Sequence, residues 1–242
     1  MTPRWRSLLP LLFCLASCAI NPAEPPSPLQ IQGMRATTIA VAPFNIALPL
    51  PVELRSSIRL VSSALMEHLE RRGKKPQLIE IGVGKTLWIE SAEEVHDSGG
   101  PRNFKSAARV FARKVQQRID FDAIIIPALY IQNASAGPRA ARWDGANQQI
   151  QFIGRSRQEI EMPLSTTVRA ASLLVYVLDA EGNPIHTKRT GLELIQHMEI
   201  RIEKKRGFDK RIWTWKDDDP AIEDVVRVRA AVAHALYPYL PK

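Results

Sequence analysis

The sequence predicts a mixed α/β (α+β) fold: a single mixed sheet packed by about three helices, in the order β-α-β-α-β, hairpin, α. Three observations support this prediction. Short apolar and β-branched runs are typical of buried strands, stretches with apolar residues at helical spacing lie between them, and a late stretch alternates apolar with polar residues. The 242 residues, 45% of them hydrophobic, suffice for one domain that buries its own core.

The amino-terminal half of the domain alternates strands and helices. Pro43 ends the first apolar run, and Gly73 ends the first helical pattern, as expected of a strand breaker and a helix cap. Ala108, Phe111 and Val115 recur at helical spacing in the second helical pattern. The predicted elements are a strand over 36–44, a helix over 51–72, a strand over 76–81, a turn-rich stretch over 90–103, a helix over 104–119 and a strand over 121–130.

The carboxy-terminal half is richer in strands. Its return strand alternates apolar and polar residues, with one break at Ile195 and Gln196 that predicts a β-bulge. Asp219 and Pro220 are typical of an N-cap and a first helical turn. The predicted elements are a polar surface insertion over 132–149, a strand over 166–178, a turn over 179–184, a return strand up to 203 and a helix from 218 or 219 to 240.

The first 17 residues have the layout of a secretory signal peptide. Arg4 and Arg6 precede a short apolar run over 8–17, and small residues follow. The run is shorter than the about 20 apolar residues that span a bilayer. The two cysteines of the chain, Cys14 and Cys18, both lie here, so the rest of the chain can form neither a disulfide nor a cysteine-based zinc site.

The junction Leu15-Ala16-Ser17-Cys18 resembles the lipobox of bacterial lipoproteins. The resemblance implies that residues 1–17 are removed and that Cys18 is lipidated, with palmitate among the acyl chains. The alternative is an ordinary signal peptide with a chance cysteine. Residues 18–35 then form a proline-rich tether, and Ala19 implies the inner leaflet of the outer membrane, facing the periplasm. The periplasmic domain is expected over 36–242.

Four segments of this domain resemble a group of periplasmic α/β domains: the curli-secretion lipoprotein, the lipoprotein activators of penicillin-binding proteins, and the amino-terminal domain of TolB. The resemblance implies an accessory subunit of a secretion or cell-wall machine. The departures are the polar segment 132–149 and the basic stretch 200–212. The four segments are TIAVAPF (38–44), FDAIIIPALY (121–130), SLLVYVLDAEGNPI (172–185) and AVAHALYPYLP (231–241).

The densest cluster of positive charge lies at 201–211 and is followed by two tryptophans. Cations beside aromatic rings suit an anionic polymer or a partner protein. The alternative is a solvated loop whose tryptophans pack on the domain. The candidate contact residues are Lys204, Lys205, Arg206, Lys210, Arg211, Trp213 and Trp215.

No motif predicts catalysis, a metal or a cofactor. Residues 82–86 read GVGKT, but Ile79 stands where a phosphate-binding loop needs its first glycine, so a glycine-rich turn is predicted. Residues 217–219 are three aspartates without the spacing of a calcium loop, which favours helix capping. No two histidines have the spacing of a helical metal pair, so all five are expected to be structural or solvated: His68, His96, His186, His197 and His234.

The sequence therefore predicts a non-enzymatic, lipid-anchored envelope protein that acts by binding. The expected partners are the membrane, through Cys18, and an envelope protein or anionic envelope polymer; nucleic acid is not expected, and a homo-oligomer stays open. One alternative is a polymer-binding scaffold, and another is an envelope hydrolase. A pore-forming ring is a third, but Arg155 and Arg157 suit a lipid-facing strand poorly.

Overall fold

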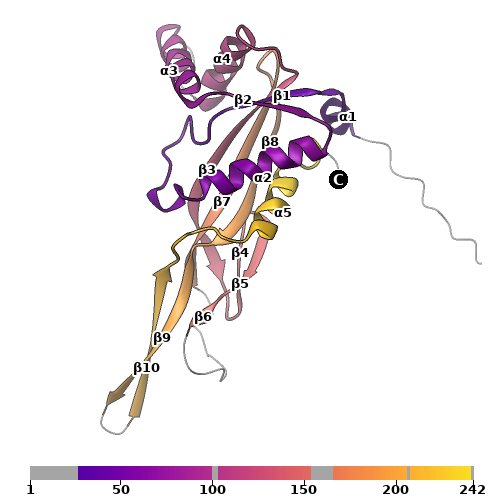
Figure 1. Ribbon diagram of the computed structural model, residues 1–242. Helices are drawn as coiled ribbons and strands as arrows, with labels where there is room; N and C mark the ends of the chain where they lie inside the picture. Colours follow the sequence, from indigo (N-terminus) through magenta and orange to yellow (C-terminus); the bar gives the residue numbers. More distant parts are fainter. Residues whose placement is uncertain (1–26, 100–102, 154–165, 206–207, 241–242) are drawn as a thin grey trace, which may run out of the picture.

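The computed structural model describes residues 27–99, 103–153, 166–205 and 208–240, and its mixed α/β fold confirms the predicted class (Figure 1). A seven-stranded mixed sheet carries helices on both faces, and a three-stranded sheet continues from its lower end in Figure 1. The prediction of a single sheet is wrong, because the chain leaves the large sheet after Ile195. The described residues form five α-helices, where about three were expected.

The large sheet combines a parallel with an antiparallel half. β1 (Thr38–Val41) lies between β2 (Lys75–Leu78) and β3 (Ala123–Ala136) and runs parallel to both. β7 (Thr166–Asp179) pairs antiparallel with β3 along all of its 14 residues, and β8 (Pro184–Leu194) pairs with β7. The expected strands, helices and hairpin occur in the predicted order, but helices over 28–35 and 81–97 and a hairpin over 140–149 are additional to it.

Helices cover both faces of this sheet because each strand sends alternate side chains to opposite sides. On one face, α2 (Ile58–Arg71) and α5 (Val225–Leu236) enclose the first core. On the other face, α3 (Ile81–Asp97) and α4 (Phe104–Gln116) enclose the second core. Strand residues of the first core are Ile39, Val41, Ile125, Leu129 and Val175, and those of the second core are Ala40, Ile124, Ile126 and Tyr176.

The folded part begins with a helix where the sequence predicted the end of a tether. Residues 28–35 form α1 (Pro28–Arg35), capped by a reciprocal pair of hydrogen bonds between Ser27 and Gln30. Gly33 packs so closely on the carboxy-terminal segment that an added Cβ would lie 1.7 Å from the carbonyl oxygen of Tyr239. The tether prediction for 18–35 is therefore wrong over its last eight residues, and residues 18–26 lie outside the described ranges.

The polar segment 132–149 is part of the sheet and not a surface insertion. β3 extends to Ala136, and β4 (Ala140–Trp143) and β5 (Ala146–Gln149) form a hairpin that pairs with its end. Asp144 and Gly145 turn the hairpin with φ angles of 39° and 73°, in the left-handed region that such a tight turn requires. The prediction failed because this segment is polar in sequence, and its few buried side chains are covered only by residues distant in the chain.

The β4–β5 hairpin closes over the other strands and creates a third core. Its turn accepts a hydrogen bond of 3.1 Å from the Gly191 amide to the Asp144 carbonyl, and Trp143 Nε1 donates to the Ala171 carbonyl, also at 3.1 Å. The third core consists of Ala134, Ala136, Ala141, Trp143, Ile150, Val168, Ala170, Leu194 and Met198.

The segment GVGKT lies inside α3, so it forms neither a phosphate-binding loop nor the expected glycine-rich turn. Gly84 is buried, and a Cβ there would lie 2.8 Å from Pro43 Cγ, which means that close packing explains this glycine. The turn-rich stretch expected over 90–103 is also partly wrong, because α3 continues to Asp97. Ser91 and Val95 are buried and prolong the packed face of that helix.

The alternating return strand is divided between two sheets. β8 ends at Leu194, and β9 (Gln196–Lys205) pairs with β10 (Phe208–Asp217) and with β6 (Phe152–Ile153) in the small sheet. The bulge expected at 195–196 is instead a passage from one sheet to the other, and the two register irregularities of the β7–β8 pair lie at Leu192 and Ile185. The β9–β10 hairpin projects from the lower end of the domain in Figure 1.

The last helix begins later than predicted. Its N-cap is Asp224, whose Oδ1 accepts a 2.9 Å hydrogen bond from the Arg227 amide, and not Asp219. Residues 218–224 form no helix. In this irregular segment Ala221 and Ile222 are buried in the first core.

We expect Gly191→Ala to lower the free energy of unfolding by about 2 kcal/mol, the cost of forcing extra atoms into a packed site. A Cβ at this position would lie 2.5 Å from both Ala146 Cβ and Trp143 Nε1, so the β4–β5 hairpin would have to move. Chemical denaturation measures the change. Gly137→Ala is the control, since its Cβ would meet nothing closer than 3.7 Å; equal effects of the two variants would contradict this account.

Candidate functional site

The predicted basic stretch lies on the β9–β10 hairpin. The four backbone pairs nearest the hairpin end are Lys205 with Phe208, Lys204 with Asp209, Glu203 with Lys210 and Ile202 with Arg211. The ladder therefore brings Lys204 and Lys205 on one strand beside Lys210 and Arg211 on the other, while Arg206 lies outside the described residues. The alternative interpretation of this stretch as a solvated loop is wrong, because its described residues form a paired β-hairpin.

Trp213 and Trp215 lie at the base of the same hairpin. Both are partly buried and pack against the third core, which also contains Met198, the backbone partner of Trp215. Their packing on the domain agrees with the alternative weighed for the two rings and means that they anchor the hairpin. Their role as partner contacts stays a prediction.

A network of charged groups fixes the base of the hairpin to the large sheet. Arg169 on β7 forms ion pairs with Glu53 and with Asp217, the latter at 3.2 Å between Nη1 and Oδ1. The hydrogen bond from Arg169 lowers the pKa of Glu53. His197 Nδ1 lies 2.6 Å from Asp218 Oδ1 on the neighbouring strand end. These contacts hold the base of the hairpin. They engage Asp217 and Asp218, two of the three aspartates that were expected to cap a helix.

A second site, which the sequence did not predict, is a pocket of about 520 Å³ between α3, α4, the segment after β1 and the large sheet. Two aromatic rings meet in its wall, Trp88 and Phe104, whose centroids lie 5.7 Å apart, and the buried Tyr176 packs on Phe104 with its centroid 4.9 Å away. The pocket is lined by Ala47, Leu48, Trp88, Ala92, Val95, His96, Asn103, Phe104, Ala107, Leu174 and Arg189.

A polar band adjoins this pocket on the same face of the sheet. The Tyr130 hydroxyl donates to Asp144 Oδ2 at 2.5 Å, and Gln132 Nε2 donates to the same oxygen and, at 2.9 Å, to Ser172 Oγ. Burial and the neighbouring carboxylate raise the pKa of Tyr130. The guanidinium of Arg189 lies over the Tyr130 ring, 5.9 Å from its centroid. No sequence signal marks this band, because its members come from three strands and a turn.

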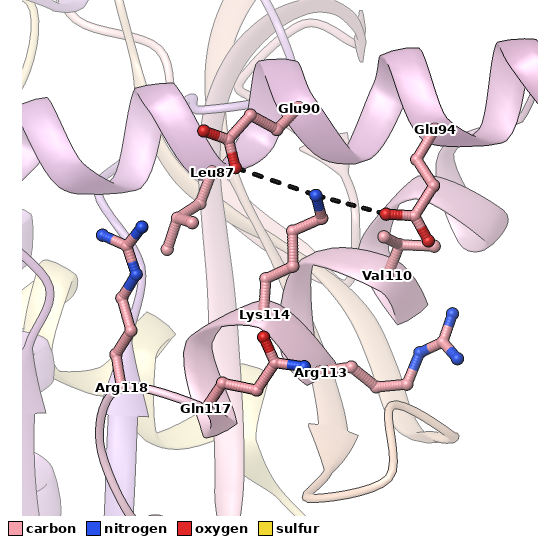
Figure 2. Close-up of a pocket in the computed structure, with 8 residues that line it drawn as sticks. All are labelled: Leu87, Glu90, Glu94, Val110, Arg113, Lys114, Gln117 and Arg118. Carbon is pink, nitrogen blue, oxygen red and sulfur yellow. Dashed lines mark ion pairs between the residues drawn. The ribbon is translucent and has the colours of Figure 1, made fainter.

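A third site is a hollow of about 300 Å³ between α3 and α4, shown in Figure 2. Lys114 Nζ lies 3.7 Å from Glu90 Oε2 and 3.2 Å from Glu94 Oε2, so one cation bridges two carboxylates on the facing helix. Arg113 and Arg118 point away from this bridge on either side (Figure 2). The charge of Lys114 is thus neutralised by two glutamates. The hollow is the site of an ion pair that holds α3 to α4.

The five histidines lie on five different elements: α2, α3, β8, β9 and α5. His68 and His186 are buried, and His186 Nε2 lies 2.7 Å from the Ala235 carbonyl oxygen. His96 is exposed beside Asp97, and His197 pairs with Asp218. Within the described ranges, no three His, Cys, Asp or Glu side chains are grouped closely enough to hold a metal ion.

The described helices are each too short or too polar to cross a membrane.

The fold and its sites define a mixed α/β domain that carries a basic β-hairpin at one end and an apolar pocket on one face. No protein-family model matches the chain, and a search of curated proteins finds no significant match either.

The buried His68 makes stability depend on pH. Burial, with the charges of Arg72 and Arg71 next, lowers the pKa of His68 from 6.5 to about 4. Between these values the unfolded chain binds a proton that the folded chain does not. We therefore expect the free energy of unfolding to be intact above pH 6.5 and to fall by on the order of 2 kcal/mol as the pH drops to about 4.

His68→Gln should remove much of this pH dependence, measured by urea denaturation between pH 4 and pH 7. The buried His186, whose pKa burial also lowers, accounts for part of the remaining slope. His96→Gln is the matched control on an exposed residue and should keep the wild-type slope. An unchanged slope in His68→Gln would show that other groups carry the effect.

Proposed function

We propose that this protein is a lipoprotein of the outer membrane that faces the periplasm and acts, without catalysis, as an accessory subunit that binds a partner through its β9–β10 hairpin. One observation carries the proposal: the hairpin with the densest basic sequence projects from the end of the domain that lies away from α1 (Figure 1). The described chain starts at α1, so an anchor attached through Cys18 would leave the hairpin free.

The length of the tether supports this orientation. Eight residues lie between Cys18 and Ser27, and a fully extended chain over this distance reaches about 30 Å at most. The α1 end of the domain would therefore stay near the membrane surface. Two or more acyl chains give stable attachment without a spanning helix.

The hairpin has the properties of a specific contact element. Its base is held by the Arg169 ion pairs and by Trp213 and Trp215 in the third core. Its outer half carries cations on both strands of the ladder, which favours an anionic surface on the partner. A rigid base lowers the entropy that binding must overcome.

We expect Cys18→Ala to release the protein from membranes and to abolish its labelling by palmitate, because Cys18 is the acylated residue of the proposed lipobox. Fractionation of cells fed labelled palmitate measures both effects. Cys14→Ala is the matched control, since Cys14 lies in the segment that would be removed. A Cys18→Ala protein that stays on membranes, together with unlabelled wild type, would contradict the anchor.

We expect changing Lys204, Lys205 and Arg206 to Ala to abolish crosslinking to a defined envelope protein in intact cells. The physical reason is the loss of three neighbouring charges from the hairpin end. A control variant with Arg55, Arg59 and Lys85 changed to Ala removes the same net charge from exposed positions on the helical layers and should crosslink normally.

Loss of crosslinking in both variants would show a nonspecific charge effect and would overturn the assignment to the hairpin. Retention of peptidoglycan or lipopolysaccharide, with no protein partner captured, would replace the accessory-subunit proposal with a polymer-binding scaffold.

A further inference from the structure

The pocket between α3, α4 and the sheet has apolar walls, and its lining includes one permanently charged side chain, the exposed Arg189. Trp88 and Phe104 form an aromatic wall, and Leu174 lies on the floor beside Arg189, to which it is paired across β7 and β8. A pocket of about 520 Å³ lies within the range of about 300–1,000 Å³ typical of small-molecule sites. Its size and lining therefore suit a small, largely apolar ligand.

The charge of Arg189 is not neutralised within the described part of the chain. Its guanidinium contacts the face of the Tyr130 ring, and no described carboxylate lies within the 4.0 Å of an ion pair from it. The nearby Asp144 carboxylate instead accepts hydrogen bonds from Tyr130 and Gln132. Arg189 is thus a cation held in place by a ring, with its donors available.

The two other polar lining residues, Asn103 and His96, each have one side-chain atom in a local hydrogen bond. Asn103 Oδ1 accepts a 2.9 Å hydrogen bond from the Ser106 amide and so caps α4. His96 Nδ1 lies 3.3 Å from Asp97 Oδ1. Arg189 is the one Lys or Arg side chain in this lining, and its permanent charge favours an anionic group on the ligand.

We propose that this pocket binds a small amphipathic carboxylate, with its apolar body against Trp88 and Phe104 and its carboxylate paired with Arg189. Arginine presents donors in a planar fork that matches a carboxylate. The apolar body removes the aromatic wall from water, which supplies most of the affinity. This site lies on the sheet face and is separate from the β9–β10 hairpin, so it goes beyond the proposed function.

Calorimetric titration of the full chain carrying Cys18→Ala, in detergent-free buffer, tests the proposal. The probes are decanoate, decanol and decyltrimethylammonium, each below its micelle-forming concentration, and 2-naphthoate as an aromatic carboxylate. We expect decanoate or 2-naphthoate to bind at least about tenfold more tightly than decanol, as a hydrogen-bonded charge contributes, and the cation to bind most weakly. The tighter of the two carboxylates tells an acyl from an aromatic ligand.

Three variants place the binding in this pocket. Arg189→Gln should weaken carboxylate binding about tenfold and remove the preference over decanol. Ala92→Phe, at an exposed position of the lining, should fill the pocket and abolish binding of every probe. Lys105→Gln removes an exposed cation from α4 outside the lining and should change affinity less than about twofold.

Circular dichroism of each variant shows whether it is folded. Equal affinities for decanoate and decanol in the wild type, undiminished carboxylate binding by Arg189→Gln, or no binding of any probe would overturn the proposal. None of these results depends on the hairpin or on the lipid, so the failure of this proposal and the failure of the proposed function are distinguishable.

Discussion

The antiparallel pairing of β3 with β7 is the constraint on which the rest of the structure depends. Its 14 backbone pairs start in the parallel part of the sheet and end in the third core. Because the two strands stay in register throughout, each side chain keeps its face over the whole length. Residues of β3 and β7 contribute to all three cores, so the helical layers, the β4–β5 hairpin and the second sheet all pack against this pair of strands.

The face that carries the pocket changes its character along β3. Ile124 and Ile126 contact the helical layer, Tyr130 and Gln132 hydrogen-bond to Asp144, and Ala134 lies in the third core. The pocket lies where the helical layer ends and the folded-over hairpin begins. Apolar walls from one layer and a cation from the sheet meet there, so a site for an amphipathic ligand follows from the boundary between two modes of packing.

The charged groups divide into those that hold the fold and those that are free to bind. Lys114 joins α3 to α4, and Arg169 fixes the hairpin base to Glu53 and Asp217. Arg189 has only the ring of Tyr130 as its described contact. In a chain with a net charge of +8, a cation without an ion-pair partner in the lining of an apolar pocket is therefore a more specific indication of a ligand than the overall charge.

The sequence by itself determined the strands and helices whose burial is periodic: β1, β3, β7, α2 and α4 all follow from local patterns of apolar residues. It also contains the contiguous junction Leu15-Ala16-Ser17-Cys18, whose resemblance to a lipobox underlies the proposed lipid anchor. The tertiary structure alone decided that residues 132–149 join the sheet and that the glycine-containing segment 82–86 is helical. It also decided that the chain passes from β8 into a second sheet at Ile195. The physical reason is that these outcomes depend on partners distant in the chain: Gly84 is accepted in a helix because Pro43 packs on it, and the polar hairpin folds because Gly191 lets it approach. The pocket was invisible for the same reason, as Trp88, Phe104 and Arg189 meet only when two layers are assembled.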